Sequence, residues 1–133
     1  MTTDIVLDAS ALVAILIERS ARADAVRERM PSLGRHAPHL IDAELGSALR
    51  RLEQQGLIDD REAAAALASG RALVDERYAH TRTLVTGAWA HRRNLSFYDA
   101  LYVALASELG IPLLTADARI ARAPRLGCEV QLV

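Results

Sequence analysis

Lysine is absent from this sequence, and all sixteen of its basic residues are arginine. Any mechanism that requires a lysine amine is therefore excluded. Seventeen acids balance the arginines, so the net charge is −1 and the isoelectric point is about 6.4. A protein that coats nucleic acid through bulk positive charge is excluded as well.

Cysteine and long hydrophobic runs are scarce too. Cys128 has no partner for an internal disulfide and cannot build a zinc site alone, which favours a reducing, intracellular setting. No run of 18 apolar residues exists, since Asp8 interrupts the first apolar stretch, and the acidic start Met1-Thr-Thr-Asp4 is unlike a signal peptide. We expect a cytoplasmic protein that does not associate with a membrane.

The chain of 133 residues suits one domain, which we expect to span residues 1–133. Strand signals alternate with helix signals along it. Strands are predicted at 4–8, 35–37, 111–115 and 128–133, and helices at 11–17, 20–30, 40–55, 60 onward through the alanine run, 83–92, 97–110 and 116–123. This alternation predicts an α/β fold with a central parallel sheet.

Four acids stand at positions that such a sheet brings together. Asp8 ends the first predicted strand, and Asp117 lies two residues beyond the strand at 111–115. Glu44 and Asp99 lie in the first turns of predicted helices. Because the functional crevice of an open parallel sheet lies beyond the carboxyl ends of its strands, we expect the four carboxylates to converge there.

Converging carboxylates have a chemical consequence. They repel one another, and each is relieved only by a proton or a cation. A set of oxygen ligands without histidine or cysteine suits a hard ion, Mg²⁺ or Mn²⁺. Such an ion polarises a phosphoryl oxygen and acidifies a bound water, which is the chemistry of phosphodiester hydrolysis.

Each acid is also open to a structural interpretation. Asp8 and Asp117 stand where a carboxylate can cap a helix, and Asp99 stands three residues after Ser96, where a capping box places a carboxylate. Glu44 has a competitor in Asp42 on the same predicted helix. No acid decides the matter alone.

Four short segments are more specific in combination. They are Asp8-Ala-Ser-Ala-Leu12, the stretch 40–51 around Glu44, Ser96-Phe-Tyr-Asp-Ala-Leu-Tyr-Val-Ala-Leu-Ala106 and Leu114-Thr-Ala-Asp117. In this order they resemble the PIN-domain ribonucleases, and more narrowly the VapC toxins of bacterial VapBC toxin–antitoxin modules. The resemblance covers essentially the whole chain, and residues 95–117 are its most specific part.

The resemblance implies a three-layer α/β/α PIN-like fold and an endoribonuclease that depends on Mg²⁺ or Mn²⁺. Carried over residue by residue, Asp8 and Asp99 match metal ligands, and Asp117 matches an acid that binds metal directly or through water. Glu44 matches the acid that positions metal or water. No acid expected from the family is missing.

The family resemblance extends to supporting groups and partners. Ser10 and Thr115 stand where hydroxyls commonly support the acidic site, although Ser10 is also the expected N-cap of the helix at 11–17. The family implies an RNA substrate, a VapB-type antitoxin that occupies and inhibits the site, and a homodimer. The apolar positions Leu12, Ile15, Leu16 and Met30 suit either the core or a groove for a partner.

Positive and aromatic residues are weaker candidates. RNA binding requires positive charge, and the arginine pairs at 50–51 and 92–93 are candidates, although the default interpretation of each pair is a solvated helix face. Trp89 is expected to pack in the core rather than to stack on a base. Tyr98 and Tyr102 flank Asp99 and are expected mainly to pack.

Other classes fit the sequence less well. Haloacid-dehalogenase phosphatases and response-regulator receiver domains also place an acid at the end of the first strand, but both rely on a lysine. The remaining alternative is a catalytically silent PIN-like module that binds protein or RNA partners. The complete acidic set favours an enzyme.

Overall fold

The computed structural model describes residues 3–133 and is built on a five-stranded sheet in which all neighbouring strands are parallel. The strand order is β3-β2-β1-β4-β5. The strands are β1 (Asp4–Leu7), β2 (Gly34–Pro38), β3 (Glu76–Tyr78), β4 (Leu113–Thr115) and β5 (Val130–Leu132). The central β1 is buried from Ile5 to Leu7, as expected of a strand covered on both faces.

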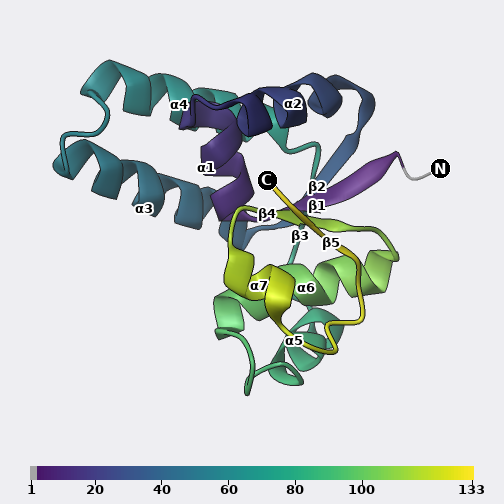
Figure 1. Cartoon of the computed structure of the whole chain (residues 1–133). Coiled ribbons are helices and arrows are strands. Elements are labelled where there is room, and N and C mark those ends of the chain that lie inside the picture. The colour runs from purple at the N-terminus through teal and green to yellow at the C-terminus, as the bar shows by residue number, and fades with distance from the viewer. Residues whose placement is uncertain (1–2) are drawn as a thin grey trace.

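Helices cover both faces of this sheet (Figure 1). One face carries α1 (Ala9–Ile17), α2 (Ala21–Arg29), α3 (Leu40–Gln54) and α4 (Asp60–Leu73). The other carries α5 (Arg82–Trp89) and α6 (Phe97–Leu109), and the short α7 (Ala118–Arg122) packs against β4 and β5. The predicted three-layer α/β/α architecture is therefore confirmed. Within residues 3–133, no helix is both long and apolar enough to cross a bilayer.

Local signals explain where several helices begin and end. The side chains of Ser20, Asp59 and Ser96 each accept a hydrogen bond from the backbone three residues on. At Asp59 the contact is reciprocal with Glu62, so the two residues form a capping box. At the end of α6, Gly110 takes a left-handed φ of 66°, where a residue without Cβ is favoured.

One local prediction was wrong, and one strand was missed. The first helix starts at Ala9, because Asp8 rather than Ser10 is its N-cap and accepts the Ala11 amide. The strand β3 was not predicted at all, since its three residues carry two charges and no apolar pattern. It is placed by its pairing with β2 and not by its own composition.

The core takes three of the four apolar positions that the sequence left open. Leu12, Ile15 and Met30 are 1%, 5% and 3% exposed, whereas Leu16 is half-buried and lines a surface hollow. At Gly70 of α4, an added Cβ would collide with the side chain of Leu45. The small residue thus lets α4 pack closely against α3.

Candidate active site

A cavity of about 390 Å³ lies at the carboxyl ends of β1 and β4. All four predicted acids line it. They come from distant parts of the chain: Asp8 from the β1–α1 junction, Glu44 from α3, Asp99 from α6 and Asp117 from the β4–α7 junction. The parallel sheet thus brings together the residues that the sequence analysis expected to converge.

Asp8 is the most buried of the four, with 3% of its surface exposed. Its Oδ1 accepts hydrogen bonds from the Ser10 hydroxyl at 2.7 Å and from the Ala11 amide at 2.8 Å. Its Oδ2 accepts the Thr115 hydroxyl. A carboxylate has about four lone-pair positions, so one position on Oδ2 stays open.

The surroundings of Asp8 work in opposite directions on its charge. The pKa of Asp8 is raised to about 6, chiefly by burial and slightly by the charge of Asp99, although the hydrogen bonds from Thr115, Ser10 and Ala11 lower it. The carboxylate is therefore held in one orientation but is poorly solvated. A bound cation would offset the free-energy cost of burying this negative charge.

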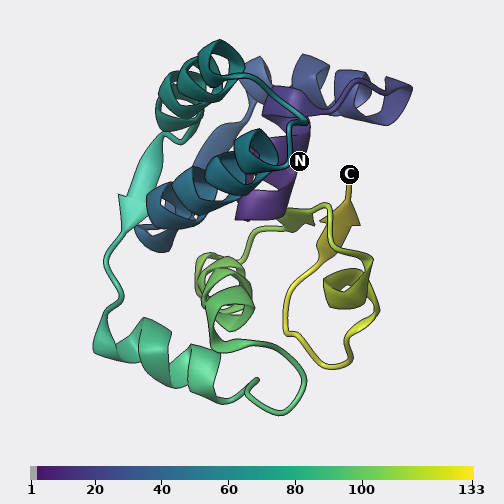
Figure 2. The ribbon, with the colours of Figure 1, turned by 90° about the vertical axis from the view of Figure 1, so that its left-hand side faces the viewer.

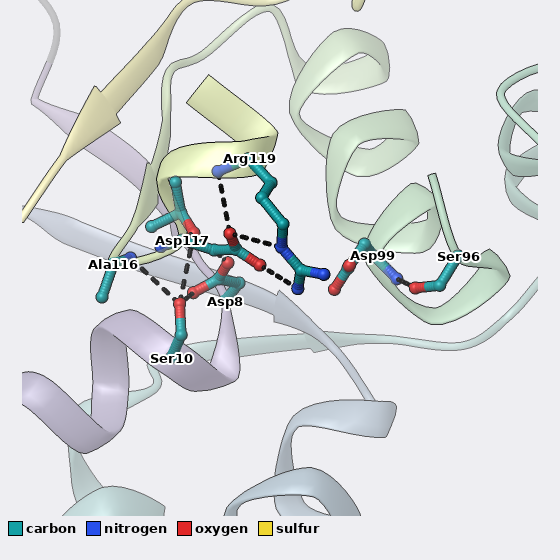
Figure 3. A network of polar contacts seen from close by, with 8 residues as sticks. Asp8, Ser10, Ser96, Asp99, Ala116, Asp117 and Arg119 are labelled. Carbon is teal, nitrogen blue, oxygen red and sulfur yellow. Dashed lines mark hydrogen bonds and ion pairs between the residues drawn. The ribbon is translucent and has the colours of Figure 1, made fainter. Parts of the chain in front are cut away.

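The two supporting hydroxyls tie both strand ends together (Figure 3). Besides contacting Asp8, the Ser10 hydroxyl accepts the Ala116 amide at 2.9 Å, and the Thr115 hydroxyl accepts the Asp117 amide at 3.0 Å. The two hydroxyls lie 3.2 Å apart. The position of Asp8 is thus fixed relative to the segment that carries Asp117.

Asp99 occupies the first turn of α6. Its amide donates to the Ser96 hydroxyl at 3.1 Å, which caps the helix and leaves the half-buried carboxylate facing the cavity. Burial raises the pKa of Asp99, and the negative charge of Asp117 raises it further. Asp99 therefore does not serve as the cap itself, because Ser96 takes that role.

Asp117 is both a helix cap and half of an ion pair. It accepts the Arg119 amide at 2.9 Å, and the guanidinium of the same residue reaches its two oxygens at 3.2 and 2.8 Å. This pairing lowers the pKa of Asp117. In Figure 3 the Arg119 guanidinium lies between Asp117 and Asp99.

Arg119 was missed by the sequence analysis. The available signal was an arginine two residues after a predicted site acid, in a short helix that Asp117 was expected to begin. The side chain of Arg119 is 81% exposed. The cation that neutralises this side of the cavity is therefore a solvent-exposed group.

The competition between Glu44 and Asp42 is resolved by their partners. Glu44 lines the cavity and accepts the hydroxyl of buried Tyr102 at 2.6 Å, while its own burial raises its pKa. Asp42 is instead paired with Arg77 at 2.6 and 2.9 Å, which lowers the pKa of Asp42. Asp42 is therefore a structural ion-pair residue.

The acids do not yet form a closed ligand set. Within residues 3–133, no three Asp, Glu, His or Cys side chains are arranged so as to enclose an ion. Arg119 engages Asp117, and Tyr102 engages Glu44. The donor chemistry nevertheless fits a hard divalent cation, because the cavity offers only oxygen ligands and Asp8 keeps one open position.

The prediction for Trp89 was wrong. Its side chain is 58% exposed. The buried side of α5 consists of Leu84 and Ala88, four residues apart, and the next position along the helix therefore faces outward.

Among the candidate arginines, Arg51 lines the cavity.

Comparison with known proteins agrees with this geometry. The PIN domain family model matches residues 5–126. Ribonuclease VapC1 of Mycobacterium tuberculosis is 47% identical over 128 residues, which cover 96% of each chain.

Solved structures share the fold. PAE2754 from Pyrobaculum aerophilum has a TM-score of 0.71 at 25% identity and covers 98% of this chain and 92% of its own. VapBC2 from Rickettsia felis, bound to a DNA fragment from its promoter, has the same TM-score at 10% identity, with 98% of each chain covered. The family match and the VapC1 identity extend over nearly the whole sequence, and the chain belongs to the PIN domain family, among the VapC ribonucleases.

Proposed function

We propose that this chain is a Mg²⁺- or Mn²⁺-dependent endoribonuclease that acts as the toxin of a VapBC module. The observation that carries the proposal is that four carboxylates from separate segments line one cavity at the carboxyl ends of the central strands. Membership of the VapC ribonucleases supports RNA as the substrate. Residues 1–133 would act as a single nuclease domain.

Asp8 and Asp99 are the proposed principal ligands of the ion. Asp8 offers a fixed, poorly solvated oxygen, and Asp99 faces it across the cavity with a raised pKa. Asp117 would join directly or through water, and Glu44, held by Tyr102, would position the ion or a water. When bound, the ion supplies charge for the scissile phosphate and acidifies a water.

Ser10 and Thr115 act through Asp8 rather than on the substrate. Their hydroxyls donate to opposite oxygens of the Asp8 carboxylate. This keeps the open position of Oδ2 available to a ligand in the cavity. Groups that orient a metal ligand in this way commonly contribute 10- to 100-fold to affinity or activity.

The proposed partners follow from family membership. A VapB-type antitoxin would inhibit the toxin by covering the cavity, and the toxin would form a homodimer. The fold neighbour from Rickettsia felis is itself a VapBC complex. A cytoplasmic location is proposed because the RNA substrate is there.

The experiment is RNA cleavage by the purified protein with and without Mg²⁺ or Mn²⁺. Cleavage should require the metal and should fall by more than about 100-fold in Asp8→Asn and Asp99→Asn, since each removes a charged ligand. Asp60→Asn is the matched control, because Asp60 is exposed on α4 and does not line the cavity. If neither the wild type nor any of the three variants cleaves RNA with either metal, the silent binding module becomes the better interpretation.

A further inference from the structure

The segment that runs from Arg77 in β3 to Tyr98, just before Asp99, has an unusual charge. Residues 77–98 contain four arginines and no acid. One of them is paired with Asp42, whereas Arg82, Arg92 and Arg93 are exposed and form no ion pair within residues 3–133. A chain with a net charge of −1 therefore carries a local excess of positive charge beside its acidic cavity.

The same segment exposes aromatic rings. Trp89 and Tyr98 are 58% and 59% exposed. Beside Trp89 lies a hollow of about 460 Å³ that is lined by Val85, Thr86, Trp89 and Phe97. The Phe97 ring stands edge-on to Trp89, with centroids 6.4 Å apart and planes at 62°, so it supports the indole from one side.

Arg92 is held against the exposed indole. Its guanidinium carbon lies 4.9 Å from the centroid of the Trp89 ring, and its Nη1 donates to the Trp89 carbonyl at 3.1 Å. A cation and an aromatic surface are thus already oriented together. Less conformational freedom has to be lost when a ligand uses both.

The start of α6 contributes to both hollows, because Phe97 lines the one beside Trp89 and Asp99 lines the acidic cavity. Phe97 and Tyr98 begin α6 and directly precede Asp99. Figure 2 shows α5 and the following loop running beneath α6 and joining it at this end. The first turn of α6 therefore lies between the hollow beside Trp89 and the acidic cavity.

We propose that the α5–α6 surface, formed by Val85, Trp89, Arg92, Arg93 and Tyr98, binds single-stranded RNA next to the scissile position. A base would stack on Trp89, and Arg92 and Arg93 would contact phosphates. Positive charge interleaved with exposed aromatic rings is how proteins hold single strands without reading their sequence. The proposal rests on the proposed ribonuclease function and adds where the strand lies and that it is unpaired.

Binding can be measured without cleavage. The probe is a fluorescein-labelled dodecauridine, titrated in EDTA and followed by anisotropy. Trp89→Ala should weaken binding about 5- to 100-fold, the range expected for loss of one stacked base, and Trp89→Phe should retain most of the affinity. Arg92→Gln should lower the slope of log Kd against log salt by about 0.7, since one phosphate contact on a single strand is lost.

Two matched controls keep the result specific. Leu57→Ala removes an equally exposed apolar side chain at the α3–α4 turn, and Arg61→Gln removes an exposed arginine of α4. Both should bind dodecauridine like the wild type. If Trp89→Ala binds as well as Leu57→Ala does, the proposal is wrong.

Sedimentation of the same variants tests the competing occupant, a second copy of the chain. If Trp89→Ala turns a dimer into a monomer at equal concentration, the α5–α6 surface is an interface between copies and the proposal is overturned. Metal-dependent cleavage by the wild type is scored separately. If the wild type cleaves RNA but Trp89→Ala binds dodecauridine normally, only the inference about the α5–α6 surface is wrong. If Trp89→Ala weakens binding but the wild type does not cleave RNA, only the ribonuclease function is wrong.

Discussion

Asp8 and Asp117 line one cavity, yet the protein holds them in opposite ways. Asp8 is buried at the end of a central strand, is fixed by three hydrogen bonds and has a raised pKa. Asp117 caps a five-residue helix, is paired with a largely exposed arginine and has a lowered pKa. The site therefore has two sides. The rigid side is Asp8, whose carboxylate forms no ion pair within residues 3–133, and the adjustable side is Asp117, whose carboxylate is paired with Arg119.

Removal of the Thr115 hydroxyl should impair the site on its rigid side, at Asp8. Thr115→Val removes the donor to Asp8 Oδ2 and the acceptor of the Asp117 amide, and we expect metal-dependent RNA cleavage to fall about 10- to 100-fold. Thr115→Ser, which keeps the hydroxyl, should retain most activity. Thr3→Val is the control, because Thr3 is exposed and precedes β1 at the opposite edge of the sheet. Equal rates for Thr115→Val and Thr3→Val would contradict a positioning role.

The two sides should also differ in stability. The pKa of Asp8 is raised from 3.8 to about 6 in the folded protein, chiefly by burial. Ionisation of Asp8 therefore destabilises the folded state. This loss of stability is absent below pH 4, grows between pH 4 and 6, and is complete above pH 6. Asp8→Asn should therefore raise the free energy of unfolding at pH 8 by up to about 3 kcal/mol, and the gain should vanish near pH 4. The measurement is urea unfolding without metal at both pH values.

Asp117→Asn sharpens that contrast. The pKa of Asp117 is lowered by Arg119, so its charge is favourable in the folded state, and asparagine caps a helix about as well as aspartate. No gain at pH 8 is expected. A gain equal to that of Asp8→Asn would show that the two carboxylates are held alike.

The adjustable side should respond to loss of its arginine. Arg119→Gln removes the guanidinium that binds both oxygens of Asp117, so a divalent ion no longer competes with it. Because exposed ion pairs are weak, we expect Mn²⁺ affinity, measured by calorimetry without RNA, to rise by up to about fivefold. Arg122→Gln removes the same charge from the same helix, and it makes no ion pair with Asp117. Identical affinities for the two variants would argue for a general charge effect.

Much of this fold could be predicted from the sequence because its elements carry local signals. Caps at Ser20, Asp59 and Ser96 and the glycine at 110 mark helix ends through their own backbone contacts. The strand β3 could not be predicted, since only its pairing with β2 makes it a strand. Trp89 was placed in the core because a large ring usually packs there, whereas its position on α5 turns it outward.

Prediction of the site depended on topology more than on single residues. The parallel arrangement was enough to bring Asp8 and Asp117 to one edge. The choice between Glu44 and Asp42 was settled only by their partners Tyr102 and Arg77. The sequence places Arg119 two residues after Asp117, but it does not fix their pairing, because the pairing depends on the direction of an exposed side chain and not on hydrophobic pattern.

The hydrogen bonds of Asp8 carry a consequence for ion selectivity. Oδ1 already accepts two donors and Oδ2 accepts one, so the carboxylate can offer a single oxygen to an ion and cannot chelate it with both. Ca²⁺ gathers six to eight oxygens and readily takes bidentate carboxylates, whereas Mg²⁺ needs fewer ligands and keeps several waters. For the proposed metal ion, the hydrogen bonds from Ser10 and Thr115 to Asp8 would therefore favour Mg²⁺ over Ca²⁺.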